Sequence, residues 1–204
     1  MSPTMLVQGI KSRPVYGTLA PRPGSAHLFV ADGEGALAIL DLAAIAPPSL
    51  WTRARIAYVP GASAARAYGT RLAAIGVDSY DERPTLTSAL PLLDGWLDGA
   101  RMGTQVYLAG TEVLIGRAMQ VALRAGVDHS AIQAEHRGSL ARRVQCVHCK
   151  GITDDVRTQP VRCASCGLML LVRDHYSRRY GAFMGVNIDA EDPGVVPPVE
   201  APFA

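Results

Sequence analysis

The spacing of the cysteines is the feature that most constrains this chain. All four lie in one short stretch, as two Cys-x-x-Cys pairs separated by thirteen residues: Cys146, Cys149, Cys163 and Cys166. Two residues between thiols let both sulfur atoms face the inside of one tight turn, and two such turns form the tetrahedral site that structural Zn²⁺ prefers. Lys150-Gly151 and Gly167 follow the pairs and suit the positive φ angles of these turns. The spacing therefore predicts a structural zinc site whose four positions are all filled, which leaves none for a substrate.

Other interpretations of the cysteines differ in the oxidation state and in the ion. Two disulfides would need an oxidising compartment, and we expect neither a signal peptide nor a membrane span ahead of the cysteines. Iron, as a single atom or a cluster, would make the site an electron carrier, although the plant-type Cys-x4-Cys-x2-Cys spacing is absent. His148 lies inside the first turn, where it either replaces a cysteine or faces solvent. Zinc is the prediction, with iron as its alternative.

Length and charge limit the class of protein. At 204 residues and 49% hydrophobic, the chain is long enough for one α/β domain and a small second unit. A net charge of +2 and an aromatic content of 6% argue against a nucleic-acid partner, which makes a DNA-binding zinc ribbon the weakest hypothesis. No apolar run approaches the roughly 20 residues of a membrane helix. We expect a cytoplasmic protein that binds neither nucleic acid nor membrane.

Strands and helices alternate through the first two thirds of the chain. Short apolar runs predict strands at residues 26–31, 55–59, 77–80, 105–109 and 131–135. Between them, the patterns predict helices at 36–46, 63–74, 85–97 and 112–125. Thr111 is placed to cap the last helix and Gly126 to end it, whereas Pro91 requires its helix to start late or to kink. This alternation predicts a parallel sheet with right-handed crossovers.

Composition divides the chain into four parts. Residues 1–24 are an extended lead-in rich in proline, serine and glycine, with one edge strand at 15–19. Residues 25–140 form the α/β domain, and residues 141–188 form a ribbon around the cysteines, with a returning strand at 168–172. Residues 189–204 are an acidic, proline-rich tail, which we expect to be disordered or laid on a partner.

A Gly-x-Gly turn, Gly33 and Gly35, follows the first predicted strand. Parallel sheets bind ligands beyond the carboxyl ends of their strands, where a pyrophosphate contacts the N–H groups of a helix N-terminus. Asp32 and Glu34 would place two carboxylates beside that phosphate, and such repulsion costs on the order of 1 kcal/mol or more. The turn is therefore either a tight structural turn or a degenerate nucleotide site.

Three segments of the α/β region form a second pattern: His27-Leu28-Phe29-Val30-Ala31-Asp32-Gly33-Glu34-Gly35, Ile56-Ala57-Tyr58-Val59 and Val106-Tyr107-Leu108-Ala109-Gly110-Thr111. They resemble the pyridine-nucleotide half of the ferredoxin reductase superfamily. The Gly-Gly-x-Gly-x-Thr-Pro and Cys-Gly-Pro motifs of that superfamily, both near the nicotinamide, are missing here. The resemblance implies a fold without hydride chemistry and no catalytic residue on this chain. The expected architecture is α/β: a degenerate, ferredoxin-reductase-like nucleotide-binding sheet followed by a small zinc ribbon.

The ribbon adds three motifs: Cys-Val-His-Cys with Cys-Ala-Ser-Cys-Gly, the run His175-Tyr176-Ser177-Arg178-Arg179, and the run Gly181-Ala182-Phe183-Met184-Gly185-Val186. In this combination they resemble the DmmA family, small accessory subunits of bacterial dimethylamine monooxygenase. That resemblance implies a multi-subunit, NADPH-dependent enzyme that oxidises dimethylamine to methylamine and formaldehyde. The implied partners are a haem-bearing oxygenase subunit and subunits of the reductase or ferredoxin type.

Within such a complex, the role expected for this chain is structural. It would hold the zinc ion and organise the haem and electron-transfer subunits, while NADPH and haem bind elsewhere in the complex. His175 is either an axial haem ligand or a docking residue. Arg178 and Arg179, near Tyr176, are either solvated surface residues or interface anchors. The alternative is an electron-transfer or nucleotide-binding reductase subunit, which needs iron at the thiolates or NADPH at the Gly-x-Gly turn.

Overall fold

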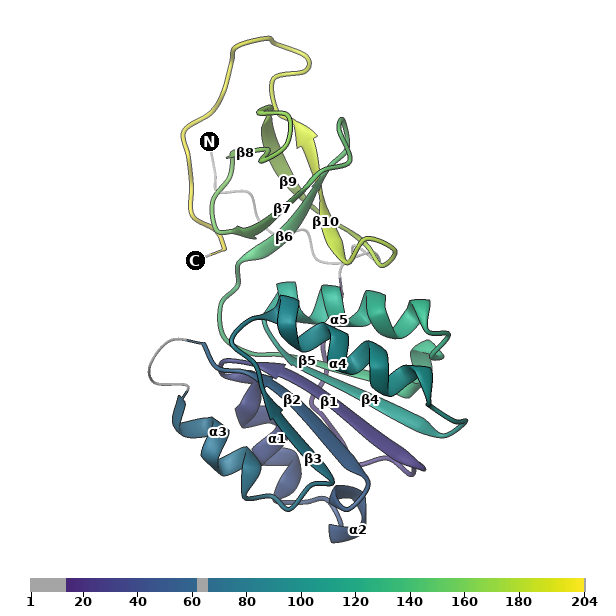
Figure 1. Ribbon diagram of the computed structural model, residues 1–204. Helices are drawn as coiled ribbons and strands as arrows, with labels where there is room; N and C mark the ends of the chain where they lie inside the picture. The colour runs from purple at the N-terminus through teal and green to yellow at the C-terminus, as the bar shows by residue number, and fades with distance from the viewer. Residues whose placement is uncertain (1–13, 62–65, 204) are drawn as a thin grey trace. The chain divides into compact units, whose positions relative to one another are not determined.

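The computed structural model describes residues 14–61 and 66–203, which fold into two compact units (Figure 1). Residues 16–138 make up the first unit, and residues 139–203 with Pro14 and Val15 belong to the second. Each unit has a hydrophobic core of its own and is described separately. Within the described ranges, none of the helices combines the length and hydrophobicity that crossing a membrane requires.

The first unit is built on a five-stranded sheet of order β3-β2-β1-β4-β5, in which all neighbouring strands are parallel. The strands are β1 (Ala26–Asp32), β2 (Ala54–Val59), β3 (Ser79–Glu82), β4 (Thr104–Gly110) and β5 (Ile132–His136). The mostly apolar sequences of β1, β2 and β4 suit the centre of the sheet because helices cover both faces of a parallel sheet. The predicted parallel sheet is confirmed.

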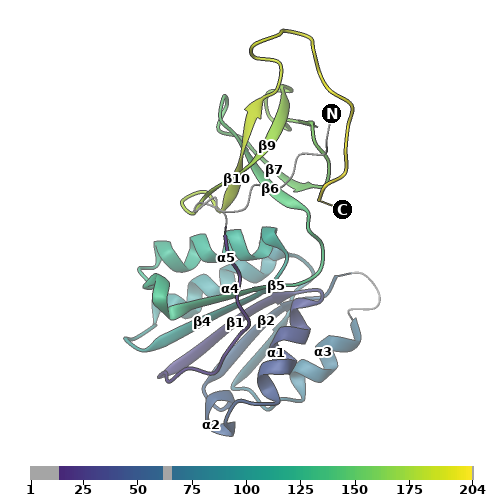
Figure 2. The same ribbon diagram turned by 180° about the vertical axis from the view of Figure 1, so that it is seen from behind.

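Helices cover the two faces of this sheet separately (Figures 1 and 2). The helices on one face are α1 (Gly35–Ala43), α2 (Pro48–Trp51) and α3 (Arg66–Ala73). Those on the other face are α4 (Leu86–Asp98) and α5 (Glu112–Arg124), and a 3₁₀ turn, His129–Ala131, precedes β5. The connections that leave β1 and β4 therefore run toward opposite edges of the sheet. The carboxyl ends of these two strands form the switch point where open α/β sheets bind ligands.

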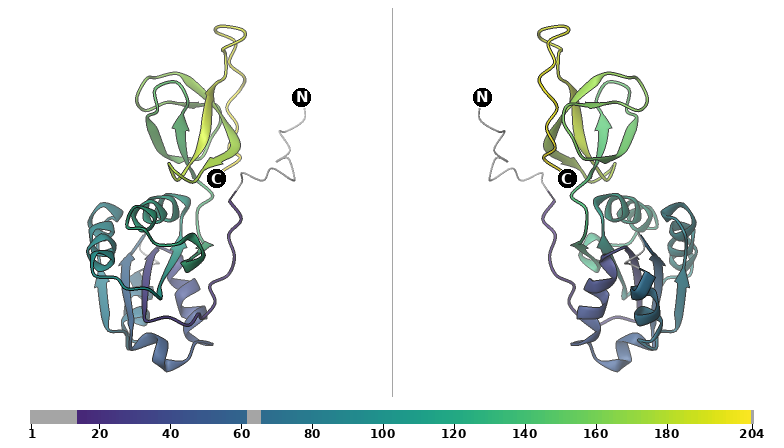
Figure 3. Two further views of the ribbon diagram at one scale, coloured as in Figure 1. Left: turned by 90° about the vertical axis from the view of Figure 1, so that its right-hand side faces the viewer. Right: turned by 90° about the vertical axis from the view of Figure 1, so that its left-hand side faces the viewer.

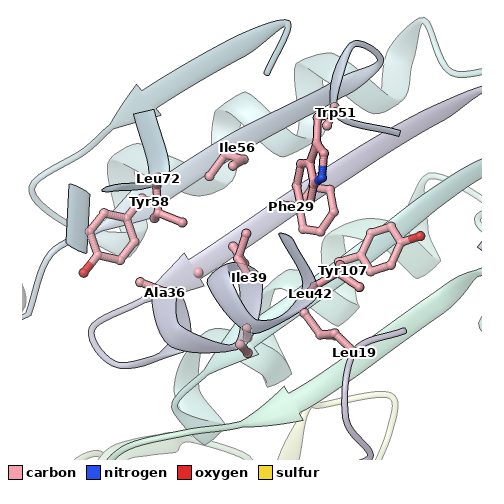
Figure 4. Close-up of a cluster of buried hydrophobic side chains, with 14 of the residues drawn as sticks. Leu19, Phe29, Ala36, Ile39, Leu42, Trp51, Ile56, Tyr58, Leu72 and Tyr107 are labelled. Atoms are coloured by element: carbon pink, nitrogen blue, oxygen red, sulfur yellow. The ribbon is translucent and has the colours of Figure 1, made fainter. Parts of the chain in front are cut away.

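Successive residues of β1 belong to different cores. Phe29 faces the side of α1, whereas Leu28 and Val30 face the side of α4 and α5. Phe29 is fully buried and stacks on Trp51 and on Tyr107, with ring centroids 5.3 and 4.3 Å apart (Figure 4). Burying apolar surface stabilises a fold by about 25 cal/mol per Å². Because β1 buries apolar side chains on both faces, its position, and with it that of the switch point, is well fixed.

Several boundaries differ from the predictions. α1 ends at Ala43 rather than residue 46, β3 lies two residues later than predicted, and the sequence pattern does not predict the short α2. α4 begins at Leu86 and contains Pro91, so its start is not delayed. The predicted start of the second helix, at residues 63–65, lies outside the described residues.

The predicted edge strand at residues 15–19 is wrong. This segment forms no strand in the described structure, although the N–H of Gly17 donates to the carbonyl of Ala134 in β5 (3.2 Å). The N–H of Leu19 donates instead to the buried carboxylate of Glu135 (2.7 Å). A side-chain acceptor therefore interrupts the backbone ladder that a strand would need.

The second unit is a five-stranded sheet of order β7-β6-β10-β9-β8 (Figure 3). Its strands are β6 (Arg142–Cys146), β7 (Ile152–Val156), β8 (Val161–Arg162), β9 (Met169–Ser177) and β10 (Ala182–Asn187). β6 and β10 pair in parallel, and the other pairs are antiparallel. β9 is longer than the predicted returning strand at 168–172, so His175 and Tyr176 lie within it.

The tail packs on this same unit, contrary to the prediction that it is disordered or laid on a partner. Gln159 and Glu200 exchange two backbone hydrogen bonds, of 2.9 and 2.8 Å. Phe203 is 4% exposed, and its N–H donates to the carbonyl of Arg157 (3.2 Å). Phe203 therefore supplies a buried apolar side chain, although the tail as a whole is acidic and rich in proline.

Candidate functional site

Two hairpin turns carry the cysteines, and equivalent hydrogen bonds build both. In the β6–β7 turn, the N–H of Cys146 donates to the carbonyl of Gly151, and the N–H of Lys150 donates to the carbonyl of Cys146, each at 2.9 Å. Cys163 and Gly167 make the equivalent bonds in the β8–β9 turn, at 2.8 and 3.0 Å. Lys150 (φ 65°) and Gly167 (φ 77°) occupy the positive-φ positions. The glycine-like turns predicted after each pair are therefore present, with Lys150 in the left-handed region of the first.

The turns bring the four sulfur atoms together. The Sγ atoms of the four cysteines lie within 4.8 Å of one another. The closest pairs are Cys146–Cys166 at 3.8 Å and Cys149–Cys163 at 3.6 Å, and all four cysteines are free. A tetrahedral ion with bonds of about 2.3 Å needs sulfurs about 3.8 Å apart, whereas a disulfide needs about 2.05 Å. The cluster therefore fits a tetrahedral metal ion and not two disulfides.

The surroundings favour the thiolate of Cys163, the form in which a cysteine binds a metal ion, whereas the neighbouring thiols raise the pKa of Cys166 to about 12. Burial by itself raises the pKa of Cys163, but the N–H groups of Cys166 and Ser165 and the neighbouring thiols outweigh burial and lower that pKa to about 6. The N–H of Gly151 donates to the sulfur of Cys149 (3.4 Å). A Cβ at Gly151 would lie 2.1 Å from Ser165 Oγ, so glycine there lets the two turns approach each other.

The residues predicted to dock a partner lie at the other end of β9 from the cysteine turn. Nine residues of strand span roughly 25–30 Å, so His175, Arg178 and Arg179 are distant from the sulfur atoms. These three side chains are exposed. Tyr176 is half-buried and meets Phe183 edge-on, with centroids 5.1 Å apart. His148, in the first cysteine turn, is exposed and is not one of the four clustered ligands.

Sequence reasoning missed a buried ion pair in this unit. Arg142 and Asp174 are 2.6 Å apart, and each side chain is 7% exposed. The Arg142 guanidinium also lies over the rings of Phe183 and Phe203, 4.1 and 4.2 Å from their centroids. Asp174, close after the apolar run Leu170–Val172 in β9, was a usable signal, because a buried carboxylate needs a partner. Nothing in the local pattern points to Phe203.

Asp32, a residue of the first unit itself, occupies the switch point. The carboxylate of Asp32 accepts hydrogen bonds from the N–H (2.8 Å) and the hydroxyl (2.6 Å) of Thr111, the residue that caps α5. Burial raises the pKa of Asp32, and the two bonds from Thr111 offset part of that effect. A Cβ at Gly110 would lie 1.8 Å from Asp32 Oδ1, so the carboxylate and the end of β4 are in close contact.

The predicted dinucleotide position does not fit a pyrophosphate. Gly35 is buried because α1 approaches β4 closely: a Cβ there would lie 2.0 Å from the carbonyl oxygen of Ala109. Gly33 has φ 46°, and its carbonyl accepts a hydrogen bond from the hydroxyl of Tyr58 (3.0 Å). The close approach of β4 thus explains Gly35 and the positive φ explains Gly33, and Asp32 is the anion that meets the donors of Thr111. The residues at this crevice do not fit NADPH.

Comparisons with known proteins place the chain in a family. A family model described as the N-terminal domain of the DmmA-like dimethylamine monooxygenase subunit matches residues 8–132. The model of the C-terminal domain of the same subunit matches residues 143–186. Among curated proteins, the chain is 34% identical over 116 residues to the heme-dependent oxidative N-demethylase delta subunit of Ectopseudomonas mendocina (strain ymp). That match covers 56% of this chain and 66% of the relative, just under two thirds of its length.

Solved structures are more distant. The ferredoxin reductase of carbazole 1,9a-dioxygenase, in its FAD apo form, is 16% identical with a TM-score of 0.40, over 56% of this chain and 34% of that chain. An intact type IV self-sufficient cytochrome P450 monooxygenase is 23% identical with a TM-score of 0.42, over 61% and 17%. The two family models between them cover β1 to β4 of the parallel sheet and both cysteine turns. This chain therefore belongs to the DmmA-like family of dimethylamine monooxygenase subunits.

Proposed function

We propose that this chain is a non-catalytic docking subunit of an NADPH-dependent dimethylamine monooxygenase. The complex would oxidise dimethylamine to methylamine and formaldehyde, with haem and NADPH held by other subunits. Family membership and the similarity to a heme-dependent oxidative N-demethylase delta subunit support this assignment. The Asp32–Thr111 contact at the switch point supports the absence of NADPH from this chain.

The observation that carries the structural role is the convergence of four cysteine sulfurs from two hairpin turns. Four protein ligands complete a tetrahedral site, so a bound Zn²⁺ would exchange no ligand with a substrate. The second unit is small, with eight buried hydrophobic residues in the core cluster of its described part, and a structural metal is one way in which units of this size gain folding energy. Zinc at Cys146, Cys149, Cys163 and Cys166 would therefore make the unit rigid enough to present a surface to other subunits.

The surface we assign to docking is the β9–β10 hairpin. His175 on β9 and Arg178 and Arg179 in the turn present exposed donors, and Arg179 lies over the ring of the exposed Tyr180 (5.7 Å). The ring of Tyr176 packs edge-on against the ring of Phe183. Arginine and tyrosine next to a rigid strand are typical of interface anchors. The haem-bearing oxygenase subunit or a subunit of the reductase or ferredoxin type is the proposed partner.

Replacing one ligand tests this role. Cys163→Ser is expected to lower the metal content from about one ion per chain and to prevent co-purification with the other subunits. His148→Ala is the matched control, because His148 lies in a cysteine turn, is exposed, and is outside the cluster. An intact and active complex formed by Cys163→Ser would overturn the structural role.

Metal analysis with a visible absorption spectrum separates zinc from iron at the same thiolates. A colourless protein that holds stoichiometric zinc is the expected result. Iron with visible absorption would favour the alternative, an electron-transfer subunit of the same complex. Calorimetric titration with NADPH tests the nucleotide-binding alternative, for which we expect no binding to this chain.

A further inference from the structure

The first unit has a cavity at the amino ends of its strands, opposite to the switch point at their carboxyl ends. Its volume is about 410 Å³, within the range of small-ligand sites, and it opens beside the amino ends of β1, β2 and β4. The part of its wall that matters chemically is formed by Leu28, Arg53, Arg55, Asp78, Trp96 and Arg101. Neither the family comparison nor the proposed docking role assigns a ligand to this edge.

The charges in this wall do not balance. Arg55 pairs with Asp78 (3.2 Å), which leaves the charges of Arg53 and Arg101. Arg53 donates from Nε to the carbonyl of Ser49 (3.1 Å), so its terminal nitrogens stay available. None of the ion pairs between described residues involves Arg53 or Arg101. Arg53 and Arg101 therefore both line one cavity, and neither forms an ion pair with a carboxylate of the described residues.

The hydroxyl groups of the wall are already used. Each donates to a backbone carbonyl of an adjacent turn: Ser25 to Met102 (3.1 Å), Thr52 to Ser49 (3.2 Å) and Thr104 to Arg101 (2.8 Å). These bonds hold the turns that carry Arg53 and Arg101. The arginines, and not the hydroxyls, are thus the donors left for a ligand.

The rest of the wall is apolar. Trp96 of α4 is half-buried and lines the cavity, so a ligand meets mainly its indole ring on this side, and Leu28 of β1, which is 3% exposed, adds only a small apolar area. A small inorganic ion would leave this side empty. An organic anion with an apolar body would cover it and gain from burying apolar surface.

The ends of the strands form two edges, a carboxyl edge with the switch point and an amino edge with the cavity, and these differ in electrostatic character. At the carboxyl edge, burial and then the carboxylates of Glu82 and Asp32 raise the pKa of Tyr58 to about 12. At the amino edge, burial and then the charge of Arg53 lower the pKa of His27. The end of α4 lies beside the cavity, and its partial charge of about −0.5 opposes an anion, but two full positive charges outweigh it.

We propose that this cavity binds a small organic carboxylate, whose oxygens are held by Arg53 and Arg101 and whose apolar body rests on Trp96 and Leu28. Guanidinium groups match carboxylate geometry with paired N–H donors. The site is independent of the metal cluster and of the docking role. It would make the amino edge of the sheet, instead of its switch point, the ligand-binding edge of this domain.

Benzoate is the probe that tests this site, on the metal-loaded full chain. Calorimetric titration should give saturable binding with one site per chain, and fluorescence should change because Trp96 lines the cavity. Arg101→Gln should weaken binding by about tenfold or more, since a charged hydrogen bond is lost. Arg124→Gln, an exposed arginine in the last turn of α5, is the matched control and should leave binding unchanged.

Three outcomes would overturn the proposal. They are an absence of saturable heat with benzoate, equal affinities of the wild type and Arg101→Gln, and equally tight binding of benzyl alcohol, which has the same ring without the charge. Metal content and subunit assembly of Arg101→Gln are expected to match the wild type. Failure of this site would therefore leave the docking function untouched, and the reverse also holds.

Discussion

Replacing Gly35 by alanine should destabilise the first unit through packing alone. Gly35 opens α1, and a Cβ there would lie 2.0 Å from the carbonyl oxygen and 2.4 Å from the carbonyl carbon of Ala109, where side chains essentially never come closer than 3.0 Å. Both atoms belong to the backbone of β4, so no side chain can move aside. Helix and strand would have to separate by about 1 Å, and overpacking of this kind costs about 1–3 kcal/mol. Because the obstacle is backbone, we expect a loss near the upper end of that range.

Gly95→Ala is a control with the same chemical change in the same unit. Gly95 lies inside α4, is exposed, and a Cβ there would meet nothing within 4 Å. Alanine stabilises an exposed helix interior by about 0.5–1 kcal/mol relative to glycine. The two variants should thus change the free energy of unfolding in opposite directions. Urea unfolding followed by the fluorescence of Trp51 and Trp96, which both lie in this unit, measures the difference.

An unchanged free energy of unfolding for Gly35→Ala would refute the packing argument. A second result would refute the interpretation of the whole switch point. If the wild type bound NADPH and Gly35→Ala lost that binding while it kept its stability, then Gly35 would serve the approach of a pyrophosphate and not of β4.

Two other predictions concern buried charges. Asp174→Ala removes the carboxylate 2.6 Å from Arg142, and we expect the free energy of unfolding of the second unit to fall by about 3–5 kcal/mol. Arg157→Ala is the control, because it breaks an exposed pair with Asp155 and should cost less than about 1 kcal/mol. Hydrogen exchange in β9 and β10 measures both losses, and equal losses would contradict the importance of burial. Asp32→Asn tests a pH dependence: because burial raises the pKa of Asp32 above 3.8, the folded state binds the proton more tightly and the wild type loses stability as the carboxyl ionises. The variant should therefore gain in thermal midpoint relative to the wild type as the pH rises above about 4, and a constant difference would show that Asp32 does not titrate as its burial requires.

The crevice at the switch point contains an internal carboxylate at the place where open α/β sheets bind ligands. In such folds, a bound phosphate satisfies the N–H groups at a helix N-terminus. Here Asp32 accepts from the N–H and hydroxyl of Thr111, so an internal carboxylate takes the place of an external anion. The sheet has packed cores on both faces, which is what the proposed docking role would need.

Local patterns predicted the parts of the fold that neighbouring residues determine. Thr111 caps α5 through the N–H of Leu114 (3.3 Å), and Gly126, at φ 82°, follows the end of that helix, as the sequence indicates. Each cysteine turn likewise closes within six residues, through hydrogen bonds between residues four or five positions apart. Such interactions can be inferred from spacing, since both partners are visible in one short window.

Contacts between distant residues were not predictable in the same way. Arg142 meets Asp174 across the sheet, and Phe203 returns from the tail to cover the same guanidinium. Arg53 and Arg101 line the same cavity at the amino ends of the strands, although they belong to different helix–strand connections, α2–β2 and α4–β4. No local spacing relates these residues, so their pairing depends on how the strands are ordered in each sheet.

The sequence by itself determined the alternation of strands and helices, the caps, and the convergence of four thiols on one tetrahedral site, because these depend on periodicity and on short-range hydrogen bonds. Tertiary structure alone decided that Asp32 occupies the switch point, that the tail folds back on its own unit, and that two arginines face one cavity. The physical reason is that the burial and the charge neutralisation of a side chain depend on which segments of the folded chain surround it. The same carboxylate or guanidinium is costly, neutral or available for a ligand according to which distant segment packs beside it.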